Sequence, residues 1–315
     1  MPCTLVHPCS CLDHHPKLES KLAGWRSRTL SWAGRSTLIT SVAQAIPSYT
    51  LSAFHIPAKN YDKLDSMTRR FWWKPKEKEG RFIAWKQWDK LCRPKAAGDL
   101  GFKKTKGVNA ALLAKLAWMV ASRKHSICME VLRNKYKVKE DWLRANPKKI
   151  VSSPTWRGIE EAKKLIVKGA CYLLGDGNSI SVWEDPWVPW IEGFKLRLKV
   201  EVYSQLHFKA HHFIDSTSKS WDVNMIKEIF YSDSAVAILT IPIPSTPRQD
   251  KMIWLPNPKG NFSVKSVHKM AFHNVNNNDQ AQSHWKYFWK AKLLKRLKML
   301  LWRIGANAMP NKVNL

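Results

Sequence analysis

The chain has 315 residues, and its 53 Lys and Arg residues against 24 Asp and Glu residues give a formal net charge of +29 at pH 7. Its hydrophobic content of 44% is typical of a folded protein and excludes a disordered tail. The longest apolar run, residues 110–121, is too short to span a bilayer and contains Lys115, so we predict no transmembrane segment. Because closely spaced phosphates attract a surface with this charge, the composition favours a polyanion as partner.

The first sixteen residues form an extension that is rich in metal-binding side chains. Its soft ligands are Cys3, His7, Cys9, Cys11, His14 and His15. Structural zinc sites usually place two ligand pairs on either side of an intervening element, and no second pair follows here. A metal site stays open as an alternative, whereas a flexible extension without metal or cofactor is the favoured interpretation. The extension also lacks the basic and apolar regions of a secretory signal.

Residues 17–136 carry helical patterns that prolines interrupt. After Pro57, apolar side chains recur every three to four residues, which predicts an amphipathic helix with Arg69 and Arg70 on its outer side. The predicted buried face consists of Tyr61, Leu64, Thr68, Phe71 and Trp72. The other elements predicted here are an irregular stretch at 74–108 with one short strand at 81–85, and helices at 109–121 and 127–136.

Residues 137–195 contain the sequence GDGNSISVWEDPWVPW (175–190), which gathers three acids in an otherwise basic chain. Its two glycines favour a tight turn, so we predict a β-hairpin that joins residues 172–174 to residues 180–183. The helix that precedes this hairpin is predicted to begin at Thr155 as its N-cap.

The three acids of this sequence are predicted to be structural. Asp176 can accept hydrogen bonds from backbone N–H groups two residues on, as short carboxylates do in turns. Neighbouring residues on a strand point to opposite faces. Glu184 and Asp185 are therefore predicted not to converge on one metal or one proton unless the strand ends between them. A hairpin with a tryptophan-lined core is therefore favoured over a catalytic site.

Residues 196–315 alternate short elements with polar links. The predicted elements are a helix at 221–231, strands at 251–255 and 261–264, a helix at 266–272, a polar spacer at 274–283 and a final helical segment at 286–310. The predicted buried side of that last segment consists of Leu293, Leu297, Leu300 and Leu301. Its lysines alternate with these leucines, which favours a solvated helix face over a nuclear-localisation signal. The fold class that we predict is mainly α with small β-hairpins (α+β).

Catalytic motifs are not found in the sequence. Two-metal phosphoryl transfer needs carboxylates that converge on a pair of ions, and the chain has no Asp-Asp step. It also lacks the phosphate-binding loop, serine-hydrolase and zinc-protease motifs. His211 and His212 are adjacent in a polar segment, which is typical of exposed side chains. The chain is therefore predicted not to be an enzyme.

Several motifs follow one another in order along the chain. They are KLAGWRSRTLSWAGRSTLITSVAQAIPSYTLSAFHIP (21–57), FWW (71–73), KLCRPKAAGDLGF (90–102), NAALLAKLAW (109–118), RNKY (133–136), SPTWRGIEEA (153–162), GDGNSISVWEDPWVP (175–189), GNFSVKSVHKM (260–270) and the run from Trp285 to Leu315. This ordered series resembles the region downstream of the palm in plant non-LTR (LINE-type) retrotransposon reverse transcriptases. The resemblance covers residues 17–315, and the succession of motifs makes it more specific than any single motif.

The resemblance implies a division of the chain and the loss of the parent activity. The implied segments are an atypical extension at 1–16, a thumb-like helical region at 17–136, a helix with a Trp-rich hairpin at 137–195, a connecting region at 196–261 and a truncated reverse-transcriptase zinc-binding domain at 262–315. The family's Phe/Tyr-x-Asp-Asp catalytic motif precedes the matching region, and its zinc ligands follow the motif that MPNKVNL (309–315) matches. We therefore expect a fragment without the catalytic palm, the zinc ligands or the RNase H domain.

Sequence-tolerant binding to RNA, DNA or an RNA–DNA hybrid is the residual function that we expect. The side chains assigned to phosphate contacts are Arg26, Arg28, Arg35, Arg69, Arg70, Lys103, Lys104 and Lys106. Most of the 17 tryptophans are predicted to lie in the core. Two alternatives stay open: an inert or protein-interaction remnant of a transposon, and a polymerase whose carboxylates come from another transposon-encoded chain.

Overall fold

The computed structural model describes residues 14–26, 29–74, 82–145, 152–200, 203, 206–215, 217–246, 248–272 and 279–309. These residues form two compact units, which are described separately below. The first unit lies within residues 1–113, 151–159 and 268–315, and the second unit lies within residues 114–150 and 160–267. No helix in these described ranges is long and apolar enough to cross a membrane.

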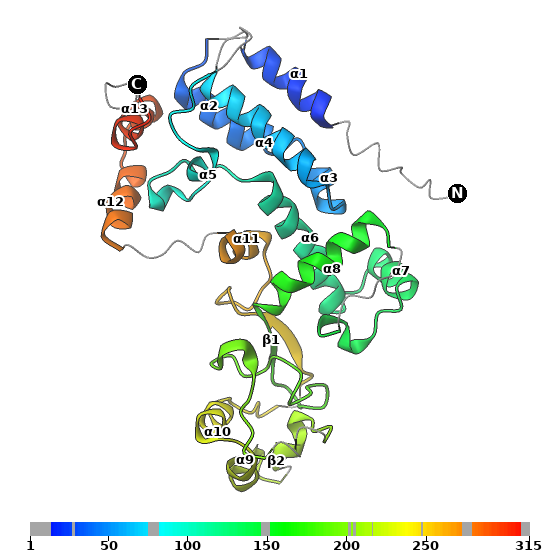
Figure 1. Cartoon of the computed structure of the whole chain (residues 1–315). Helices are drawn as coiled ribbons and strands as arrows, with labels where there is room; N and C mark the ends of the chain where they lie inside the picture. Colours follow the sequence, from blue (N-terminus) through cyan, green and yellow to red (C-terminus); the bar gives the residue numbers. More distant parts are fainter. Residues whose placement is uncertain are drawn as a thin grey trace. The chain divides into compact units, whose positions relative to one another are not determined.

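Helices dominate both units (Figure 1). The helices are α1 (His14–Arg26), α2 (Trp32–Leu38), α3 (Ser48–Ala53), α4 (Ala58–Trp73), α5 (Trp88–Leu91), α6 (Thr105–Ala121), α7 (Ile127–Lys135), α8 (Pro154–Val167), α9 (Val223–Ile229), α10 (Ser232–Leu239), α11 (Val264–Phe272), α12 (Asp279–Lys290) and α13 (Lys295–Gly305). The strands are β1 (Ala170–Leu173), β2 (Ile214–Asp215), β3 (Ser220–Trp221) and β4 (Lys251–Trp254). The prediction of a mainly α fold with small β elements is confirmed.

The core of the first unit is organised around α4. Its apolar side chains recur at helical spacing, and α1 and α2 pack against it. The predicted buried face is confirmed, because Tyr61, Leu64, Thr68, Phe71 and Trp72 are all buried. The ring of Trp72 meets Phe102 and Trp302 edge to face, at centroid distances of 5.3 and 6.4 Å. Such aromatic pairs stabilise a core beyond the area that they bury.

The buried face of α13 differs from the predicted one. Met299 and Trp302 are buried, and Trp302 Nε1 donates a hydrogen bond of 2.9 Å to the carbonyl of Gly98. The leucines that were predicted to be buried are between 43% and 47% exposed, namely Leu293, Leu297, Leu300 and Leu301. The prediction was wrong because apolar residues cover a wide arc of this helix, so that its pattern allows two orientations. The contacts of Trp302 with Trp72 and Gly98 select one of them.

The second unit contains both small sheets. β1 pairs antiparallel with β4, with Ala170 opposite Trp254, and β2 pairs antiparallel with β3. The predicted hairpin between residues 172–174 and 180–183 is wrong, because the strand beside β1 comes from residues 251–254. The GDGNS segment does follow β1, and Tyr172 N of β1 donates a hydrogen bond of 2.6 Å to the carbonyl of Pro186 beyond it, but residues 180–183 form no strand paired with β1.

Three local predictions also need correction. Residues 82–85 and 261–263 form no strand, and α11 already begins at Val264. The cap of α8 is Ser153 rather than Thr155, because Ser153 Oγ accepts a hydrogen bond of 3.3 Å from Trp156 N. Short stretches of β-favouring residues need a partner strand, and neither residues 82–85 nor residues 261–263 have one.

Some predictions concern residues that the structure does not describe. They are the predicted metal ligands of residues 1–13, Arg28 and the start of the polar spacer.

Cys92 and Cys171 are expected to react with a maleimide at least about tenfold more slowly than Cys128, because only the thiolate reacts. Burial raises the pKa of the Cys171 thiol to about 12 and also raises that of Cys92, whereas Cys128 is exposed on α7. Brief labelling of the native chain followed by peptide mass spectrometry resolves each thiol. The same labelling in urea is the control, and there all three should react alike. Equal rates in the native chain would contradict the burial of both thiols.

Candidate nucleic-acid interface

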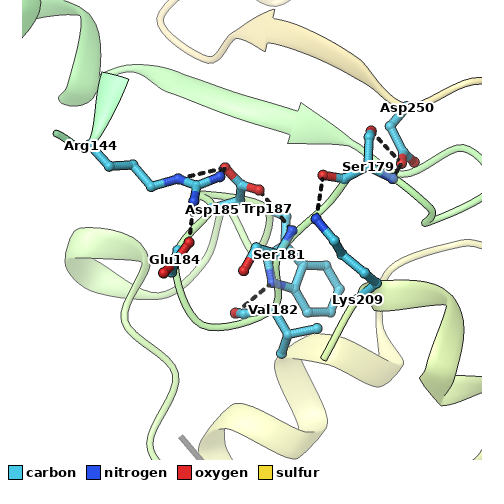
Figure 2. Close-up of polar contacts among 9 residues, drawn as sticks. All are labelled: Arg144, Ser179, Ser181, Val182, Glu184, Asp185, Trp187, Lys209 and Asp250. Carbon is cyan, nitrogen blue, oxygen red and sulfur yellow. Dashed lines mark hydrogen bonds and ion pairs between the residues drawn. The ribbon is translucent and has the colours of Figure 1, made fainter. Parts of the chain in front are cut away.

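The sequence GDGNS (175–179) folds into a turn that the carboxylate of Asp250 holds. Asp250 accepts hydrogen bonds from the backbone N–H groups of Gly175, Gly177 and Ser179, at 2.7, 3.0 and 2.9 Å, and another from Ser179 Oγ at 2.8 Å. Figure 2 shows Asp250 beside Ser179. Both glycines are required, since a Cβ at Gly175 would lie 2.3 Å from the carbonyl oxygen of Arg248, and Gly177 has a φ of +73°.

The acids of this sequence are bound by groups of the chain itself. Asp176 accepts a hydrogen bond of 3.2 Å from Asn178 N, so its predicted role in the turn is confirmed. Arg144 forms ion pairs with both Glu184 and Asp185 (Figure 2). Residues 182–184 form a turn rather than a strand, so the predicted exception applies and both acids reach the same guanidinium.

Asp185 is the buried member of this arrangement. Its carboxylate accepts a hydrogen bond of 2.7 Å from Ser181 N and receives Arg144 Nη2 at 2.5 Å. Burial raises the pKa of Asp185, whereas the Ser181 bond and Arg144 lower it. The indole of Trp187 donates to the carbonyl of Val182 at 3.2 Å, within the same turn. The segment is thus an internally bonded structural unit.

Two of the predicted phosphate-binding residues lie together on one side of α4. Arg26 and Arg70 line a groove of about 240 Å³ that also contains Lys63 and Glu19. We call Arg26, Lys63 and Arg70 the cationic groove. Three cations against one acid leave this groove positively charged, and Arg70 and Lys63 are exposed. A phosphate can therefore approach these side chains from solvent.

Three other predicted residues lie on the opposite side of Ser66, in a depression of about 510 Å³. The cations there are Arg69, Lys104 and Lys106, and the acids are Asp62, Asp65 and Asp89. Lys104 Nζ lies 2.6 Å from an Asp89 carboxylate oxygen. Burial raises the pKa of Asp65, although hydrogen bonds from Thr105 lower it. The balance of charges makes this depression a weaker anion site than the cationic groove.

The remaining predicted residues do not belong to a common site. Arg35 is buried, its Nη1 donates to the carbonyl of Trp72 at 2.7 Å, and its guanidinium lies 3.8 Å from the centre of the Trp32 ring. Burial, together with the nearby Arg303, lowers the pKa of Arg35 to about 10. Arg35 is therefore a core residue, and its assignment to a phosphate contact is corrected. Lys103 is exposed but apart from the cationic groove, and Arg28 lies outside the described residues.

Lys63 was missed by the sequence prediction. It precedes Arg70 by seven residues, which is two helical turns, so the two side chains lie on the same side of α4. That spacing was available in the sequence. The contribution of Arg26 from α1 to the same groove depends on the packing of α1 against α4, which the sequence does not reveal.

The described residues thus define a basic, mainly helical protein with a cationic groove beside α4. No family model matches the chain. The chain is 29% identical over 300 residues to a protein of Arabidopsis thaliana whose provisional name is ribonuclease H protein; the match covers 93% of this chain and 47% of that protein. It is 32% identical over 147 residues to a second protein of Arabidopsis thaliana, named an uncharacterized mitochondrial protein; that match covers 46% of this chain and 93% of the relative.

The chain belongs to the same family as this mitochondrial protein, because the match spans almost the whole of the relative. It spans about half the length of the ribonuclease H-named relative.

Proposed function

We propose that the chain derives from a plant non-LTR retrotransposon reverse transcriptase, from the region that follows the palm, and that it binds RNA, DNA or an RNA–DNA hybrid without sequence preference. The cationic groove is the observation that carries the binding proposal. Lys and Arg side chains that face solvent gain free energy when they neutralise phosphates and release counterions. The name of the longer relative, which refers to an enzyme of nucleic acids, supports the proposal.

Reversing the charge of the cationic groove tests this proposal. The double variant Lys63→Glu/Arg70→Glu is expected to bind an RNA–DNA hybrid about tenfold more weakly, with a salt dependence shallower by about two units of slope. Fluorescence anisotropy with a labelled hybrid, measured over a range of salt concentrations, gives both values. The matched control is Lys168→Glu/Lys259→Glu, which changes the net charge equally at exposed positions of the second unit. An equal loss in both variants would mean that only the overall charge attracts the hybrid.

The second candidate function is a protein-interaction remnant, and the exposed apolar side of α13 favours it. The exposed residues there are Leu297, Leu300, Leu301 and Ile304. This alternative predicts that binding to nucleic acid disappears near physiological salt and that heparin competes as well as a primer–template does. A preference for the primer–template would favour the first function.

We also propose that the chain has no polymerase activity of its own. The sequence contains no Asp-Asp step, and the convergent carboxylates of two-metal catalysis would have to come from another chain. Primer extension by the full chain with Mg²⁺ is the direct test. Extension of the primer would overturn this proposal and favour the polymerase alternative.

A further inference from the structure

A pocket in the second unit is lined by residues other than those of the cationic groove. Its volume is about 790 Å³, which is within the range of pockets that hold small molecules. It is bordered by the ends of α6 and α7, by the turn that carries Arg144, by Tyr172 of β1 and by Asp185. Its basic lining residues are Arg123, His125, Arg133, Lys137, Lys139 and Arg144.

The charge of this lining is strongly positive. Asp185 is the only acid among the lining residues that the structure describes, and Arg144 already pairs with it (Figure 2). Cations gathered at this density repel one another, and an anion that enters the pocket would relieve that repulsion. Arginine supplies a planar set of donors that matches phosphate oxygens, and lysine supplies a mobile charge.

The ends of α6 and α7 provide an independent observation. After α6, Lys124 N donates to Met119 O at 3.1 Å and Arg123 N donates to Val120 O at 3.2 Å. After α7, Val138 N donates to Arg133 O at 2.9 Å and Lys137 N donates to Asn134 O at 3.3 Å. Both helices therefore end in a Schellman motif.

The left-handed position of each Schellman motif is usually glycine, because any Cβ is strained there. Here Arg123 occupies the first position with a φ of +50°, and Lys137 occupies the second with a φ of +47°. Long basic side chains thus occupy both strained positions, and both line the same pocket. Strain that recurs at one pocket indicates a role for these side chains beyond ending the helices.

Favourable interaction with the helix dipoles is the structural explanation that must be separated from binding. A cation near a helix C-terminus is stabilised by the dipole, and Arg133 Nη2 further ties the two ends together by donating to Met119 O and Lys124 O at 3.2 and 2.8 Å. The dipole favours any cation in the last turn, but it does not require a strained backbone to carry one. Glycine at these positions would end both helices with less strain.

We propose that this pocket binds the phosphate groups of nucleotides, either as free nucleotides or within a single strand. Its volume of about 790 Å³ is large enough for a nucleotide. The proposal concerns residues other than the cationic groove, so it stands independently of the function proposed above.

Glycine substitutions separate ligand binding from folding. The double variant Arg123→Gly/Lys137→Gly is expected to bind ATP, pyrophosphate and a short single-stranded oligonucleotide about tenfold more weakly. The same variant should unfold at the same urea concentration as the unchanged chain or at a higher one, because both strained positions are relieved. Isothermal titration calorimetry and urea unfolding of the full chain measure the two effects.

The matched control is Lys219→Gly. Lys219 has a φ of +49° in the exposed turn between β2 and β3, so the same substitution removes one cation from the same backbone conformation outside the pocket. Lys219→Gly should leave binding within twofold of the unchanged chain.

The relative affinities of the unchanged chain identify the ligand. Tighter binding of the oligonucleotide than of ATP would identify a single strand, and equal binding would identify free nucleotides. Both results support the pocket.

Three results would overturn the proposal. Unchanged binding in Arg123→Gly/Lys137→Gly would show that the pocket is not the site. An equal loss in Lys219→Gly would show that only net charge matters. Earlier unfolding of the double variant in urea would show that both cations serve the helix ends. The Lys63→Glu/Arg70→Glu variant should keep its affinity for ATP, which distinguishes failure of the cationic groove from failure of this pocket.

Discussion

Replacing Trp302 with alanine is expected to lower the free energy of unfolding by about 3–5 kcal/mol, the range for large aromatic side chains removed from a core. Trp302 is fully buried, contacts the ring of Trp72 and donates a hydrogen bond to the carbonyl of Gly98. The substitution would leave a cavity and an unpaired carbonyl. Urea unfolding followed by tryptophan fluorescence measures the loss, and maleimide labelling of Cys92, which belongs to the same core cluster, should become faster.

The matched control for this prediction is Leu301→Ala on the same helix. Leu301 is 46% exposed, so its removal should change the free energy of unfolding by no more than about 0.5–1 kcal/mol. The two variants together decide which face of α13 is buried. A larger effect from Leu301 than from Trp302 would favour the orientation predicted from the sequence and contradict the one described above.

Replacing Asp250 with alanine is expected to lower the free energy of unfolding by about 3 kcal/mol, because it removes the acceptor of two half-buried backbone N–H groups and of two exposed donors of Ser179. The backbone N–H groups of Gly175, Gly177 and Ser179 would all lose their partner. Asp250→Asn keeps one acceptor oxygen and should lose about half as much. Urea unfolding measures the change, and labelling of Cys171 in β1 reports on the same part of the second unit.

Asp176→Ala is the control for Asp250. Asp176 lies in the same turn but is exposed, and it accepts hydrogen bonds from Asn178 N and Asn178 Nδ2 at 3.2 and 3.0 Å. Its removal should therefore have a much smaller effect than that of Asp250. Equal effects would mean that the turn is held by its local sequence and that Asp250 contributes little.

The local sequence predicted those features that depend on neighbours along the chain. The buried face of α4 followed from apolar residues at helical spacing, and the role of Asp176 followed from the short reach of its carboxylate. The fold class followed in the same way, since long helical patterns outnumber short strand patterns. In the candidate interface, Lys63 could have been found by the same spacing argument that placed Arg70 on the outer side of α4.

The tertiary structure decided every feature that joins distant segments. The sequence could not show that β1 pairs with β4, that Asp250 holds the glycine turn or that Arg144 joins Glu184 to Asp185. The partners in these contacts are between 40 and 84 residues apart along the chain. Arg35 illustrates the same limit, since this arginine of a basic segment donates a hydrogen bond to the carbonyl of Trp72 in the core. The physical reason is that apolar patterning fixes which side chains avoid water, whereas packing between distant segments selects their partners.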